Sequence, residues 1–251
     1  MRKSDGSAPT RAWRRSARIL SAAVATAFTS AFVREAAAQA YVNALDRGWY
    51  NHTGYHESEN DNYFVGHGSQ VEYANWFAFN IPSFPRAAIG ATFSAWNPAN
   101  DPSSSDKEGY GGDTTETYTL FDVSTPVTSL RAGGTDLVAI HNDLKSGTSY
   151  GSRTVSAADN GTLVQVPLNS TALAAINAAR GSTFATGGFV TSIAGTANQF
   201  LFSGTGGFHT ARLELTFAPV VGIFRRRIVS SCQQLEPRRR PPKARRRSSS
   251  V

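Results

Sequence analysis

A polar segment near the start of the chain is rich in side chains that bind metal ions. Six residues between positions 51 and 69 carry an imidazole or a carboxylate: His52, His56, Glu57, Glu59, Asp61 and His67. Carboxylate oxygens suit Ca²⁺, whereas imidazole nitrogens suit Zn²⁺ or Cu²⁺. The spacing matches neither the HExxH motif nor an EF-hand loop, which favours a solvated, turn-rich loop without metal. We therefore expect no resident cofactor, and the alternatives are a structural Ca²⁺ ion or a transition metal bound by this loop.

Aromatic residues suggest a second kind of site. Exposed rings stack on the apolar faces of sugars, and the candidate ligand-binding residues are Trp49, Trp76, Trp96 and Tyr110. The alternative is that these rings belong to the buried core, which is the commoner place for Trp. Trp76 falls on the strand face opposite Phe77 and Phe79, so one of these two faces is exposed unless a helix or a long loop covers it.

Two recognised enzyme motifs do not accompany these residues. The sequence contains neither the HExxH motif nor a P-loop. Two pairs of acids, Glu57 with Glu59 and Asp113 with Glu116, are of the type that serves a glycosidase as acid and base, but sequence does not reveal their separation in space. We expect His141 to be a hydrogen-bonded structural residue. The prediction is therefore a protein without enzymatic activity, with a glycan hydrolase as the alternative.

The middle of the chain predicts an all-β fold. From residue 41 to residue 217, short apolar or β-branched runs alternate with Gly, Asn, Asp and Ser. The clearest strand is 211–217, in which apolar and polar residues alternate strictly. Further strands are expected at 72–81, 88–96, 115–123, 137–142, 152–156, 163–168, 184–193 and 199–203. This number of short strands favours an antiparallel two-sheet sandwich.

One segment departs from this pattern and predicts a helix. Residues 169–180 are rich in Ala, and Asn169 or Ser170 can accept hydrogen bonds from the free N–H groups of a first helical turn. Gly181 follows, and glycine commonly ends a helix in the left-handed conformation. We expect a single short surface helix at 170–180.

Parts of this domain resemble exported bacterial proteins of the PEP-CTERM type. The segments that carry the resemblance are DRGWYNHTGYHESENDNYFVG, NWFAFNIPSF, YTLFDVSTPVTSL, YGSRTVS, VPLNSTALAAINAARG and ARLELTF. More distantly, their layout resembles jelly-roll carbohydrate-binding modules. The resemblance implies a β-sandwich with jelly-roll character, exported by Gram-negative bacteria and linked to exopolysaccharide or surface matrix. Proteins of this type end in Pro-Glu-Pro, an apolar span and an Arg cluster, whereas this chain has no Pro-Glu-Pro before its Arg-rich end.

The charge of the chain is distributed unevenly. The formal net charge is +7, yet residues 41–224 hold fifteen acidic residues and eight Lys or Arg. This excludes a basic globular nucleic-acid-binding domain, which needs cations clustered on its folded surface. The excess positive charge lies at the two ends of the chain. Cys232 is the only cysteine, so no intrachain disulfide can form.

The two ends predict a leader and a tail. A basic stretch precedes the apolar run 19–33, and small residues at positions 38 and 40 match a signal-peptidase site. We expect a signal peptide at 1–40, a β-sandwich domain at 41–217 and a disordered basic tail at 218–251. The apolar run is too short for a comfortable membrane span, so no transmembrane segment is expected in the mature chain.

These features together predict a non-catalytic module that is secreted or associated with the cell surface. We expect it to bind polysaccharide or to contribute to an extracellular matrix, without specific nucleic-acid binding. Two alternatives stay open, namely a secreted glycan hydrolase that uses loop carboxylates and a purely structural matrix protein.

Overall fold

The computed structural model describes residues 37–68, 70–99, 109–194, 198–203, 205 and 211–219. The expected leader and basic tail therefore lie almost wholly outside the described residues. The expected leader boundary at Ala40 falls inside the first strand, which begins at Ala38.

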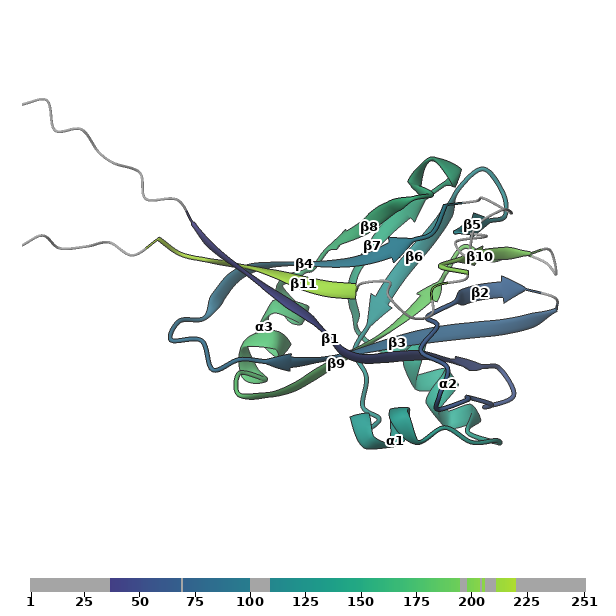
Figure 1. The fold of residues 1–251 in the computed structure, drawn as a ribbon, viewed down its shortest axis with the longest axis horizontal. Helices are drawn as coiled ribbons and strands as arrows, with labels where there is room; N and C mark the ends of the chain where they lie inside the picture. Colours follow the sequence, from purple (N-terminus) through teal and green to yellow (C-terminus); the bar gives the residue numbers. More distant parts are fainter. Residues whose placement is uncertain are drawn as a thin grey trace, which may run out of the picture. The chain divides into compact units, whose positions relative to one another are not determined.

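The described residues form a fold made mostly of antiparallel strands (Figure 1). The strands are β1 (Ala38–Asn51), β2 (Val65–Gly68), β3 (Val71–Ile81), β4 (Ala88–Asn97), β5 (Tyr110–Gly111), β6 (Glu116–Phe121), β7 (Ser149–Val155), β8 (Thr162–Pro167), β9 (Ser182–Val190), β10 (Gln199–Leu201) and β11 (Ala211–Phe217). The helices are α1 (Val127–Ala132), α2 (Val138–Leu144), α3 (Ser170–Ala178) and the 3-10 turn η1 (Ala157–Asp159). The prediction of an antiparallel all-β fold is confirmed at this level.

The long strand β1 connects two wings of the sheet. Its first half pairs with β11, which continues to β4 and β8, and its second half pairs with β3. The register shifts between Ala44 and Asp46, and such an irregularity bends a strand at the point where it changes partners. The other edge of β3 pairs with β2 near its start and with β9 beyond it, and β9 leads on to β6 and β7.

The sheet curls until its two ends approach each other, which gives a half-barrel. Hydrogen bonding links all eleven strands of the described residues into one curled sheet. At its ends, Arg153 on β7 donates to the carbonyl oxygen of Gln165 on β8 at 3.3 Å. The backbone N–H of Asn169 likewise donates to the Tyr150 carbonyl at 2.8 Å.

Strand β3 is buried on both faces because each face is covered by different elements. On the inner face, Phe77 packs against Phe93 of β4, with ring centroids 4.8 Å apart. On the outer face, Trp76 packs with Leu130 of α1 and Leu144 of α2. The two short helices therefore cover the outer face of this wing.

Two helix predictions need correction. The expectation of a single helix is wrong, because α1 and α2 are also present. The expected strand 137–142 lies largely within α2, where His141 and Leu144 are buried three positions apart on the side that packs against the sheet. A short apolar run does not distinguish a buried strand from a buried helix by periodicity alone, and here the packing against β3 and β9 selects the helix.

The predicted helix at 170–180 is confirmed as α3, both in its position and in its N-terminal capping residue. Asn169 Oδ1 accepts hydrogen bonds from the N–H groups of Thr171 and Ala172, at 3.1 and 3.0 Å. The helix ends at Ala178, slightly before the expected end, and Gly181 adopts a φ of +78°.

Candidate ligand-binding groove

An open groove with a volume of about 340 Å³ lies where β1, β3 and β10 meet the segment that leads into β2. Its lining residues combine aromatic rings with amide and hydroxyl side chains. They are Trp49, Asn60, Asn62, Phe64, Gly68, Tyr73, Asn198, Phe200 and Ser203. None of these described residues is charged.

The rings form a continuous aromatic wall across three strands. Trp49 on β1 pairs with Asn75 in register, so it shares a face of the sheet with Asn75 and with Tyr73 two residues earlier. The ring centroids of Trp49 and Tyr73 are 5.3 Å apart, those of Tyr73 and Phe64 are 4.9 Å apart, and those of Phe64 and Phe200 are 5.2 Å apart. Phe64 and Tyr73 are only partly buried, so the wall presents ring surface to the groove.

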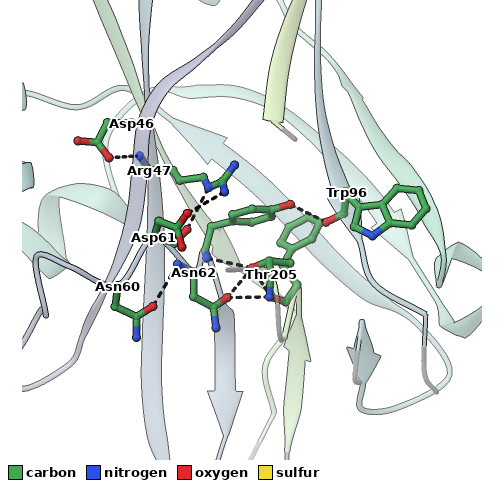
Figure 2. Close-up of polar contacts among 9 residues, drawn as sticks. Asp46, Arg47, Asn60, Asp61, Asn62, Trp96 and Thr205 are labelled. Carbon is green, nitrogen blue, oxygen red and sulfur yellow. Dashed lines mark hydrogen bonds and ion pairs between the residues drawn. The ribbon is translucent and has the colours of Figure 1, made fainter. Parts of the chain in front are cut away.

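Two of the amide side chains that line the groove, Asn60 and Asn62, lie on the segment that leads into β2, and Figure 2 shows their contacts. Asn60 Oδ1 accepts from the backbone N–H of Asn62 at 3.1 Å, and Asn62 Oδ1 accepts from the backbone N–H of Thr205 at 3.1 Å. Both oxygens are therefore used to hold the segment in place. The two amide nitrogens donate to no described residue, and in Figure 2 they lie on the same side of the segment. They remain available as hydrogen-bond donors to a ligand.

Contacts with neighbouring strands fix this segment before any ligand binds (Figure 2). Arg47 on β1 makes an ion pair with Asp61, with Nη2 and Oδ2 3.1 Å apart, and its Nε donates to the Asp61 carbonyl at 3.0 Å. The hydroxyl of Tyr63 donates to the Trp96 carbonyl at 2.9 Å, and its backbone N–H donates to Thr205 Oγ1 at 3.0 Å. A preformed groove of this kind avoids part of the entropic cost of ordering on binding.

Comparison with known proteins assigns no family to this arrangement. No family model matches the chain. No curated protein matches it either.

The structure places the four predicted ligand-binding residues in different surroundings. Trp49 lines the groove, whereas Trp76 is 1% exposed and lies beneath α1 and α2. Trp96 is partly buried on β4, and in Figure 2 its indole points away from the other residues drawn. Tyr110 is 7% exposed, and its hydroxyl donates to the carbonyl oxygen of Asp113.

Sequence reasoning missed three of the four rings that line the groove. For Tyr73 the sequence pattern is informative, because the alternation in 72–81 places its side chain on the same strand face as that of Phe77. Phe64 lies in the polar segment 51–69, whose imidazoles and carboxylates indicate metal ligands, and Phe200 lies on a short strand whose neighbours the sequence does not reveal.

The six predicted metal ligands are spread over several surroundings. His52, Glu57, Glu59 and Asp61 are exposed, and His67 is partly buried on β2. His56 is 3% exposed and packs against the ring of Tyr50, with centroids 4.7 Å apart. Burial lowers the pKa of its imidazole. Within the described ranges, no three His, Cys, Asp or Glu side chains gather closely enough to hold a metal ion.

One match to the GxSxG pattern of serine hydrolases runs from Gly147 to Gly151. In those enzymes the serine sits on a sharp turn from a strand to a helix. Here Ser149 is the first residue of β7, and the strand continues beyond it. The match therefore lacks the backbone context that makes the motif catalytic.

Among the described residues, no helix is both long and apolar enough to cross a membrane.

Proposed function

We propose that this protein is a non-catalytic module that binds a neutral polysaccharide in the groove between Trp49 and Phe200. The observation that carries the proposal is the combination of an aromatic wall with two unused amide donors in one open groove. Aromatic rings offer a large apolar surface for the faces of sugar rings, and a few placed polar groups then fix orientation. The absence of charge among the described lining residues favours a neutral glycan over an acidic one.

The proposal includes export and the finer architecture expected from the sequence. Export is supported by the basic stretch, apolar run and small residues at the start of the chain. A sandwich with jelly-roll character is supported by the two wings of the curled sheet, whose inner faces meet through Phe77 of β3 and Phe93 of β4. In this proposal the module lies outside the cell or at its surface, where polysaccharide is available.

The test is binding of neutral soluble polysaccharides, measured by affinity electrophoresis and isothermal titration calorimetry. Phe64→Ala removes the central ring of the wall, and we expect at least about a tenfold loss of affinity, which corresponds to about 1.4 kcal/mol. Asn60→Asp keeps the oxygen that holds the segment but replaces the donor with a negative charge, so it should also weaken binding. Tyr41→Ala is the matched control, because Tyr41 is a 56% exposed ring on β1 that does not line the groove.

Thermal melts of all variants establish that each is folded before its affinity is interpreted. Equal affinity in the wild type, Phe64→Ala and Asn60→Asp would contradict the proposed site. Release of reducing ends from a bound polysaccharide would replace the non-catalytic proposal with the hydrolase alternative. Failure to bind any neutral glycan in the panel would contradict the proposed ligand class.

A further inference from the structure

Glu116 is a buried carboxylate that forms no ion pair with any described residue. It begins β6 and is 1% exposed. Its Oε2 accepts a hydrogen bond from the hydroxyl of Ser192, whereas its Oε1 is buried without a hydrogen-bond partner among the described residues. A buried ionised carboxylate is costly unless a positive charge or hydrogen bonds compensate it.

A second carboxylate, the exposed side chain of Asp113, lies on the turn that the unpartnered oxygen faces. A Cβ at Gly112 would lie 2.8 Å from Glu116 Oε1 and 3.2 Å from the Cα of Gln199, so Oε1 faces the turn between β5 and β6 and the start of β10. Asp113 belongs to this turn, and its Oδ2 accepts from Gln199 Nε2 at 2.9 Å. Its Oδ1 has no hydrogen-bond partner among the described residues.

A neighbouring side chain joins the same turn. Tyr110 begins β5, and its hydroxyl donates to the carbonyl oxygen of Asp113. Within the described part of the chain, no Lys or Arg forms an ion pair with either carboxylate. The junction of β5, β6 and β10 therefore gathers two acids without a cation.

We infer that Glu116 and Asp113 bind a divalent cation, Ca²⁺ in preference to a transition metal. Both side chains supply oxygen, the donor that a hard cation prefers, and among the described residues no third His, Cys, Asp or Glu lies close enough to share an ion with them. Ca²⁺ takes six to eight oxygen ligands, so uncharged oxygens and water would complete its shell. Gln199 pairs with His67, so the site lies next to the end of the segment 51–69. It does not depend on the proposed glycan function.

The test is Ca²⁺ binding to the full chain after treatment with a chelator. We expect calorimetry to show binding with a Kd of about 0.1–1 mM, the range of extracellular Ca²⁺ modules, and Ca²⁺ to raise the melting temperature. Glu116→Gln keeps the shape of the side chain and removes its charge, so the variant should lose the Ca²⁺ response. Glu57→Gln, which changes an exposed acid of the segment 51–69, is the matched control and should respond like the wild type.

A second variant keeps the inference testable if Glu116→Gln does not fold. Asp113→Asn should bind Ca²⁺ at least about tenfold more weakly, because it removes one of the two charged ligands. No Ca²⁺ binding by the wild type would overturn the inference. Binding that is unchanged in Asp113→Asn, or that is lost in Glu57→Gln, would overturn it by placing the ion elsewhere.

Discussion

His141 should make the stability of this protein depend on pH below neutrality. The side chain lies on α2, is 1% exposed, and has its Nε2 3.5 Å from Glu72 Oε1 of β3. Burial is the main reason why its pKa falls from 6.5 to about 4, and the positive charge of Lys145 one turn later lowers it further. The negative charge of Glu72 opposes this shift, and His52 adds a small effect in the same direction as Lys145.

The direction of the effect follows from where the proton binds. Between pH 6.5 and pH 4 the unfolded chain protonates this histidine while the folded protein does not, so protons favour unfolding. The contribution of neutral His141 is fully present above about pH 6.5 and is lost as the pH falls to about 4. Each pKa unit corresponds to about 1.4 kcal/mol, so the whole loss is on the order of 3 kcal/mol.

Urea unfolding at pH 7 and pH 4.5 measures this loss when the wild type is compared with His141→Asn. The variant has a polar side chain that does not titrate. Between pH 7 and pH 4.5 we therefore expect the wild type to lose about 2–3 kcal/mol more free energy of unfolding than the variant loses. His56, which also has a lowered pKa, contributes to both proteins and cancels in the comparison. Lys145→Met should raise the pKa of His141 and reduce the loss in acid. The same pH dependence in the wild type and His141→Asn would refute the reasoning.

Three further substitutions test the contacts that hold the fold, each by chemical denaturation. Tyr118→Phe removes a hydroxyl that donates to the buried Asn75 Oδ1 at 2.9 Å, and leaving that oxygen unsatisfied should cost about 1–3 kcal/mol. Asn169→Ala removes both N-cap hydrogen bonds of α3 and should cost about 1 kcal/mol. Gly187→Ala places a Cβ 2.3 Å from the carbonyl oxygen of Leu144 in α2, and this clash should lower the free energy of unfolding by at least about 1–3 kcal/mol. Gly90→Ala is its control, because a Cβ at Gly90 meets no atom closer than 3.7 Å. A midpoint equal to that of the wild type would contradict the contact concerned.

The parts of the fold that the sequence predicts are those with a regular period. Strand β11 has alternating buried and partly buried residues along its whole length, as the pattern of 211–217 indicates. Helix α3 has both a capping residue and a glycine stop. In contrast, β1 has no clear alternation, because one half packs in one wing and the other half in the second wing, with a register shift between them.

The groove was harder to predict because its residues come from distant segments. The four aromatic side chains come together only after β1, β2, β3 and β10 have paired; they are Trp49, Phe64, Tyr73 and Phe200. A local sequence pattern does not reveal which strands become neighbours. The type of residue was informative, since aromatic rings were expected to bind a ligand. The choice among the rings required the register of the sheet.

Trp49 and Trp76 show why register decides which aromatic residues are available to a ligand. Trp49 lies opposite Asn75, whereas Trp76 lies opposite Gly48, so the two indoles belong to opposite faces of neighbouring strands. Helices α1 and α2 cover the outer face and bury Trp76. The face that carries Trp49 is sealed at Phe77, where β4 packs against β3, but it opens near Tyr73, where the groove begins. The proposed ligand site is therefore the end of the core-forming face that the second wing does not cover. There Trp49 and Phe200 are each 9% exposed, and Phe64 and Tyr73 are only partly buried.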